Sequence, residues 1–108
     1  MKPEPKCIQV EMDGREYVRL LGGPPESISM KSGAVALQPG RTVGRHNTDI
    51  YEELLIVLEG EGSLLLGESD QLETKTGSVL YCPPDTEHDV CNTGTGILRY
   101  IYTVAKTR

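Results

Sequence analysis

The sequence predicts an all-β domain built from short antiparallel strands. Twelve glycines and seven prolines favour turns, whereas alanine, the best helix former, occurs at only 3 of 108 positions. Valine, isoleucine, threonine and tyrosine, which suit a pleated sheet, occupy 28 positions. Segments rich in these residues recur about every ten residues, with turn-forming residues between them. This pattern indicates a jelly roll or another closed antiparallel β fold.

Strand candidates can be assigned in order along the chain. Asp13 and Gly14 separate two strand-like runs, which predicts an N-terminal hairpin over residues 6–21. Residues 27–38 have the pattern of one or two strands. Residues 54–58 are apolar at every position, so this strand needs cover on both faces. The remaining strand candidates are residues 63–66, 78–82, 88–91 and 97–104.

The length of the chain matches one ordinary domain, so we expect a single domain over residues 1–108. Residues 1–5 are expected to be a flexible lead-in, and they lack the apolar core of a secretory signal. The expected location is therefore the cytoplasm. The three cysteines have neither disulfide-framework nor zinc-finger spacing, and we expect them to be mostly structural.

The charge distribution and the apolar runs exclude two kinds of partner. The net charge is −5, with +1 on residues 1–50 and −6 on residues 51–108. There is no basic stripe to contact phosphates, so we expect no nucleic acid partner. No apolar run approaches the roughly 20 residues of a membrane span, so we expect no membrane partner either.

The chain contains two histidines, and both belong to spaced motifs. The first motif reads Gly40, five residues, His46, one residue, Thr48, four residues, Glu53, six residues, Gly60. Histidine and glutamate offer the nitrogen and oxygen donors that bind transition metals. The first motif therefore supplies candidate metal ligands.

The second motif follows 16 residues later along the chain. It reads Gly77, five residues, Pro83, one residue, Asp85, two residues, His88, three residues, Asn92. It adds a second imidazole to the donors of the first motif.

These two segments, residues 40–60 and 77–92, resemble the two signature motifs of the cupin family at every fixed position but two. Asp85 stands where the family has glycine, and aspartate tolerates left-handed turn conformations better than most residues, so the turn is expected to form. Thr48 stands where the family has a second histidine. A neutral hydroxyl is a much weaker metal ligand than an imidazole. We therefore expect Thr48 to bond a metal-bound water.

The resemblance implies a double-stranded β-helix, or jelly-roll barrel, whose pocket holds a divalent transition metal (Zn, Ni, Mn, Fe or Co) on His46, Glu53 and His88. Barrel closure can bring such distant residues together. Two imidazoles and one carboxylate are the donors of facial-triad iron sites and of zinc sites with open positions. Two alternatives stay open: both histidines are hydrogen-bonded pocket residues, or Glu52 is the inward acid. The six-residue spacing to the motif glycine favours Glu53.

Three further residues are candidates for lining the pocket. Alternation along a strand places one of them on the same face as His88, and the other two are half-polar aromatics. These candidates are Asn92, Tyr51 and Tyr81. Tyr100 and Tyr102 could also line a pocket, although packing in a core or at a rim is the commoner role of tyrosine.

Two classes of function follow. In the first, the protein is a metal-dependent enzyme, such as an oxygenase or isomerase, acting on a small oxygenated or acidic molecule. In the second, it is a non-catalytic module that binds a sugar or organic acid beside a degenerate metal site. Arg41 and Arg45 could guide an acidic ligand, but odd-numbered neighbours of an inward His46 point outward, so we expect them in solvent.

The apolar run at residues 54–58 also bears on assembly. If Glu53 points inward, Leu55 does too, and Leu54, Ile56 and Leu58 face the other way. Cover for that outer face could come from the N-terminal hairpin or from a second copy. Because symmetric dimers are the commonest oligomers, we expect a homodimer.

Overall fold

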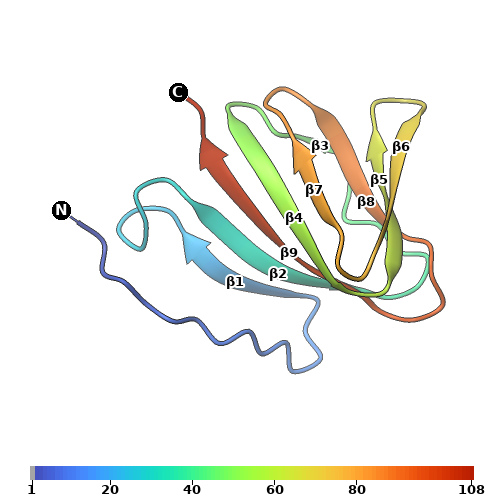
Figure 1. Ribbon diagram of the computed structural model, residues 1–108, viewed down its shortest axis with the longest axis horizontal. Coiled ribbons are helices and arrows are strands. Elements are labelled where there is room, and N and C mark those ends of the chain that lie inside the picture. Colours follow the sequence, from blue (N-terminus) through green and yellow to red (C-terminus); the bar gives the residue numbers. More distant parts are fainter. Residues whose placement is uncertain (1) are drawn as a thin grey trace.

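A computed structural model describes residues 2–108, which form nine β-strands (Figure 1). The strands are β1 (Tyr17–Gly22), β2 (Lys31–Leu37), β3 (His46–Asn47), β4 (Tyr51–Glu59), β5 (Glu61–Leu66), β6 (Asp70–Lys75), β7 (Val79–Cys82), β8 (Glu87–Asn92) and β9 (Leu98–Lys106). They pair antiparallel in two sheets, ordered β1-β2-β9-β4-β7 and β3-β8-β5-β6. The all-β prediction is therefore confirmed.

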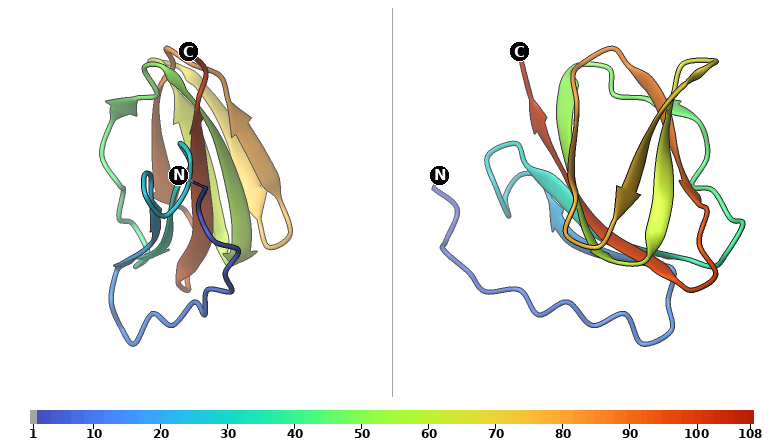
Figure 2. Two further views of the ribbon diagram at one scale, coloured as in Figure 1. Left: turned by 90° about the vertical axis from the view of Figure 1, so that its left-hand side faces the viewer. Right: turned by 45° about the vertical axis from the view of Figure 1, so that its right-hand side comes forward.

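The two sheets face each other and enclose the core between them (Figure 2). Side chains alternate along each strand, so every second residue points into this space. On β8, for example, His88, Val90 and Asn92 are buried, whereas Cys91 is only half-buried. The core consists of Val35, Leu37, Leu55, Val57, Leu64, Leu80, Cys82, Val90, Leu98 and Tyr100.

Strand β4 has one buried face and one exposed face. Leu55 is 2% exposed, whereas Leu54, Ile56 and Leu58 are 39%, 36% and 41% exposed. The predicted inward and outward assignment of this strand is therefore correct. The cover that the sequence led us to expect over its outer face is not supplied by the described chain.

The predicted N-terminal hairpin is wrong. The turn itself forms, because Asp13 and Gly14 have φ of 51° and 79° and the Arg15 N–H donates to the Met12 carbonyl oxygen at 2.8 Å. However, residues 6–12 join no strand and run as an extended segment apart from the sheets (Figure 1). A turn sequence fixes local backbone geometry, but a strand also needs a partner, and the residues after the turn pair with β2 instead.

Strand β6 was missed in the sequence. Its burial pattern leaves five of six residues exposed, so it lacks the apolar alternation that marks a half-buried strand. It lies at the edge of its sheet, paired only with β5. Edge strands can be polar on both faces because solvent reaches them.

None of the described residues forms a helix long and apolar enough to cross a membrane.

Two turns hold the motif segments in place. Gly60 has φ of 95°, and a Cβ there would lie 2.3 Å from the Ile97 carbonyl oxygen, so only glycine fits. Asp85 adopts φ of 52°, as expected for an aspartate in place of glycine, and its N–H donates to the Asp49 carbonyl oxygen at 2.9 Å. This hydrogen bond ties the turn before β8 to the turn before β4.

Candidate metal centre

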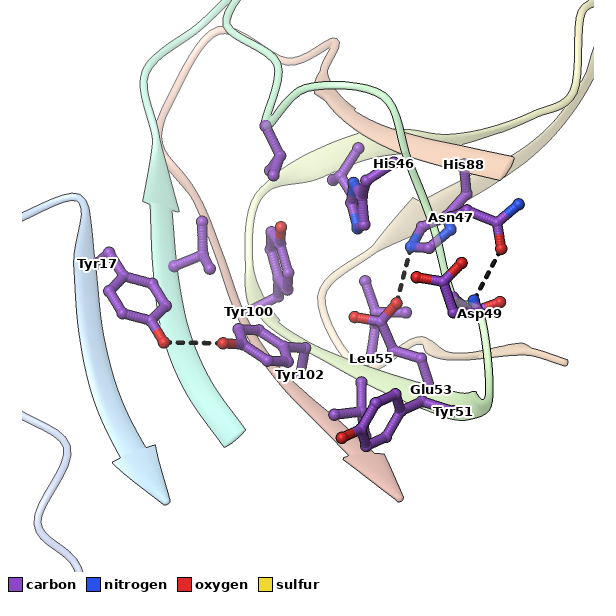
Figure 3. Close-up of a pocket in the computed structure, with 15 residues that line it drawn as sticks. Tyr17, His46, Asn47, Asp49, Tyr51, Glu53, Leu55, His88, Tyr100 and Tyr102 are labelled. Carbon is purple, nitrogen blue, oxygen red and sulfur yellow. Dashed lines mark hydrogen bonds and ion pairs between the residues drawn. The ribbon is translucent and has the colours of Figure 1, made fainter. Parts of the chain in front are cut away.

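The fold brings the three predicted metal ligands together from both sheets (Figure 3). His46 on β3 lies directly opposite His88 on β8. Glu53 lies on β4, in the other sheet. One donor atom from each residue lies within 4.8 Å of the other two. The cluster therefore depends on the two sheets facing each other.

Backbone carbonyls orient both imidazole rings. Nδ1 of His46 lies 2.7 Å from the Gly44 carbonyl oxygen, and Nδ1 of His88 lies 3.0 Å from that of Thr86. A carbonyl oxygen can only accept, so each Nδ1 carries the proton. Each Nε2 then keeps its lone pair, which is the tautomer a metal ligand needs.

The pair formed by His88 and Glu53 is almost completely buried. Nε2 of His88 lies 2.7 Å from Oε1 of Glu53, but it has no well-directed hydrogen-bond partner. Buried polar atoms are normally satisfied. Two acceptors at this distance repel unless a cation lies between or beside them, and either a proton or a metal ion can serve. The donors therefore fit a metal ion.

The pKa of His88 reflects its buried position beside Glu53. Burial lowers the pKa, but the Glu53 carboxylate and the Thr86 carbonyl together outweigh burial and raise the pKa above the ordinary value of 6.5. The raised pKa shows that the site favours a positive charge at Nε2. A metal ion would compete with the proton for the same lone pair.

His46 lies at the open end of the cluster and is solvent-exposed, unlike the other two candidate ligands. Its ring centroid is 4.1 Å from that of His88, with an angle of 59° between the planes. A molecule in the adjoining cavity can therefore approach the cluster from the side of His46.

Thr48 is buried next to the cluster, where it connects two loops. Its hydroxyl donates to the Pro83 carbonyl oxygen at 2.7 Å and accepts from the Thr86 N–H at 3.0 Å. Thr86 in turn holds Nδ1 of His88, so Thr48 positions this ring through one intermediate residue. Its proton is committed to Pro83, so the hydroxyl has only acceptor capacity left. The expected bond from Thr48 to a metal-bound water stays a prediction.

A cavity of about 420 Å³ adjoins the cluster. It is lined by Tyr17, Val35, Val43, His46, Asn47, Thr48, Asp49, Tyr51, Glu53, Leu55, His88, Val90, Tyr100, Tyr102 and Val104. Its lining thus joins a polar end at the cluster to an apolar and aromatic body. Tyr51, which the sequence predicted to line a pocket, is part of this lining.

Two predicted pocket residues lie elsewhere, which corrects that interpretation. Asn92 is buried, but its side-chain N–H groups donate to the Leu37 and Gly96 carbonyl oxygens. Four residues of strand separate it from His88, or about 13 Å, so it shares the face of His88 but not its end of the barrel. Tyr81 is 54% exposed and donates to Glu52 on the outer face, because its neighbour Cys82 points inward.

Tyr17, Asn47 and Asp49 line the cavity although the sequence did not predict it, whereas Tyr100 and Tyr102, for which the sequence left both a pocket and a core position open, also line it. The last two lie two residues apart on β9 and so share a face. That spacing could have marked them as a pair. For Tyr17 no such signal exists, because its place follows from the pairing of β1 with β2.

The comparisons with known proteins identify the class of protein that this fold and site define. Residues 33–104 match the cupin domain family, so the chain belongs to the cupin family. The double-stranded β-helix predicted from the motifs is therefore confirmed. Among curated proteins, none matches the sequence significantly.

Solved structures with little sequence identity share the fold. The cupin domain of Cnp3 from Schizosaccharomyces pombe is 19% identical at a TM-score of 0.74, with 83% of this chain and 63% of that chain covered. A conserved barrel domain protein from Salinispora arenicola is 18% identical at a TM-score of 0.79, covering 95% and 91%. A protein from Thermotoga maritima, described as a predicted oxalate decarboxylase, is 18% identical at a TM-score of 0.67, covering 92% and 99%.

Proposed function

We propose that this cupin binds a divalent transition metal through His46, Glu53 and His88 and holds a small-molecule ligand in the adjoining cavity. One observation carries the proposal: three donors from two sheets lie within 4.8 Å of one another. The buried Nε2 of His88, which has no well-directed hydrogen-bond partner although Glu53 Oε1 lies 2.7 Å away, supports it. The metal would be Zn, Ni, Mn, Fe or Co, which accept mixed imidazole and carboxylate ligands.

The residues of the chain have distinct tasks in this proposal. Gly44 and Thr86 fix the histidine tautomers, and burial restricts the Glu53 side chain, which is 8% exposed. When bound, the ion would act as a Lewis acid toward an oxygen atom of the ligand. The apolar lining of the cavity excludes water from the body of the ligand.

Two uses of such a site fit the chain. A metal-dependent enzyme is supported by a set of only three protein donors, because three donors leave coordination positions for a ligand. A non-catalytic binding module is supported by Thr48, which offers only acceptor capacity where the cupin motif has a further imidazole. Mass spectrometry of the ligand recovered after incubation with metal-loaded protein separates them, because only an enzyme changes the ligand.

The test of the metal proposal is elemental analysis of protein purified without an affinity tag, which would itself bind metal. The wild type should carry one of the five metals, and His46→Ala and His88→Ala should each lose most of it while circular dichroism still shows a folded β protein. Metal content unchanged in both folded variants would contradict the proposed site.

A further inference from the structure

The cavity beside the metal ligands has features that select among chemical classes of ligand. We infer that its ligand is an uncharged ring compound whose acceptor oxygen receives a hydrogen bond from Tyr100. This inference rests on the proposed function, because it assigns the ligand class of the same pocket. It disfavours sugars and organic acids, the ligand classes that the sequence left open.

The charges around the cavity disfavour an anion. Its charged lining residues are two acids, Asp49 and Glu53, and no lysine or arginine lines it in the part of the chain that the structure describes. With two neutral imidazoles, a divalent ion would balance these two carboxylates, so the loaded pocket has no net formal charge. Apart from the proposed metal ion, a small carboxylate would find no cation in the lining to replace its hydration.

The nearby cations are held outside the cavity. Lys31 does not line the cavity, and its ammonium lies over the Tyr51 ring, 5.2 Å from the ring centre. Arg45 is exposed and lies 3.7 Å from the Glu87 carboxylate. Arg41 is also exposed and does not line the cavity. The cavity therefore lacks the arginine clamp that recognises carboxylates in many sites.

The body of the cavity is apolar and aromatic. Five aliphatic side chains and four tyrosine rings line it, so most of a bound molecule would contact carbon. Aromatic side chains favour ring ligands through stacked or edge-to-face contacts. A sugar, which carries a hydroxyl on most carbons, would place several of these groups against the apolar body of the cavity, away from its polar end.

Tyr17 and Tyr102 form an aromatic wall of the cavity, and this wall depends on a glycine. The Tyr17 and Tyr102 hydroxyls lie 2.8 Å apart, and their rings stack at 6.3 Å across β2. A Cβ at Gly33 would lie 2.6 Å from the Tyr17 ring and 2.8 Å from the Tyr102 ring. Gly33 thus lets two rings from β1 and β9 close over the strand between them. Their mutual hydrogen bond partly satisfies both hydroxyls, which leaves this wall less polar.

Tyr100 differs from these two rings because none of the hydrogen bonds among residues 2–108 involves its hydroxyl, and that oxygen is accessible rather than sealed in the core. The residue is 4% exposed, and its side chain extends from β9 into the cavity on the side of His46 (Figure 3). Burial, together with the charges of Glu53 and Asp89, raises its pKa, so the hydroxyl keeps its proton. It is therefore a donor open to a ligand in the cavity that the three candidate metal ligands also line.

The test uses matched probes: benzamide, benzoate and benzamidinium share one planar shape but are neutral, anionic and cationic. Oxalate is the fourth probe. Incorporation of 3-fluorotyrosine labels five positions, of which Tyr81 lies outside the cavity and serves as an internal control. Fluorine NMR titrations are run on metal-free and zinc-loaded protein, and zinc stoichiometry is measured on the same samples. A neutral ligand of nine heavy atoms should bind with Kd of about 1–10 mM.

We expect benzamide to shift the Tyr100 resonance but not that of Tyr81, and to bind more tightly than the three charged probes. The Tyr100→Phe variant should weaken benzamide binding by about three- to tenfold, and Tyr81→Phe should leave it unchanged. Equal or tighter binding of benzoate, benzamidinium or oxalate, an unchanged affinity in Tyr100→Phe, or no benzamide binding would overturn the inference. Absence of zinc with the benzamide result intact would contradict only the metal proposal.

Discussion

The two faces of strand β4 are made from similar residues but have opposite roles. On the inner face, Glu53 is 8% exposed and Leu55 is 2% exposed. On the outer face, Leu54 and Ile56 are 39% and 36% exposed, and Glu52 accepts a hydrogen bond from Tyr81. Alternation alone separates a candidate metal ligand from a surface acid one residue away. Adjacent residues of the same type are therefore natural controls for each other.

The largest expected difference between the two faces concerns stability. Leu55→Ala leaves a cavity in the core and should lower the free energy of unfolding by about 2–5 kcal/mol. Leu54→Ala removes a partly exposed side chain and should lower it by less than about 1 kcal/mol. Urea denaturation of both variants measures the difference. Equal destabilisation would mean that the inward and outward assignment of β4 is wrong.

The next comparison concerns Thr48, which positions His88 through Thr86. Thr48→Val removes the hydroxyl that accepts from the Thr86 N–H, and it should weaken zinc binding by about 10- to 100-fold. Thr48→Ser keeps the hydroxyl and should restore most of the affinity. Competition titrations with a zinc chelator measure both variants. If Ser and Val variants bind equally, the hydroxyl does not orient the site.

A homodimer remains a prediction, and we propose that it forms through the outer face of β4 and β7. Exposed apolar residues of the two strands are cross-strand neighbours there, since Ile56 lies opposite Val79. Light scattering of the wild type should give a dimer, and Ile56→Glu should give a monomer because it places a charge in the interface. A wild type that stays monomeric at about 100 μM would contradict the proposal, since stable dimers form well below that concentration.

A smaller effect is expected from pH in the metal-free protein. The pKa of His88 is raised in the folded state, so its protonation stabilises the fold below the ordinary value of 6.5, and this contribution is lost as pH rises through the folded pKa. Metal-free protein should therefore melt at a lower temperature at pH values above the folded pKa of His88 than at pH values below 6.5. His88→Gln, compared with wild type over the same range, should remove this part of the pH dependence. If the melting temperature of His88→Gln depends on pH as that of the wild type does, His88 is not the group responsible.

The sequence predicted features that depend on alternation and spacing. The count back from Gly60 identified Glu53 rather than Glu52 as the inward acid, because the turn fixes the register of β4. Alternation also placed Asn92 on the inner face. It could not tell which end of the barrel holds the residue, because that depends on how far the sheet extends past His88.

Features that depend on pairing between distant segments were not predictable in the same way. Residues 6–12 look like a strand, but no neighbour in the described chain pairs with them. Strand β6 has a neighbour but lacks an apolar pattern. The aromatic wall of Tyr17 and Tyr102 requires β1 and β9 to flank Gly33 of β2, an order of strands that local patterns do not encode.

Isothermal titration calorimetry of zinc binding tests the central claim most directly. It compares two neighbouring variants, Glu53→Gln and Glu52→Gln, with the wild type. The two changes are chemically identical and one residue apart. We predict that wild type and Glu52→Gln bind one zinc ion with the same affinity, and that Glu53→Gln binds at least about tenfold more weakly, because a neutral amide replaces the only anionic ligand. Equal affinity of Glu53→Gln and Glu52→Gln would contradict a metal centre at this site.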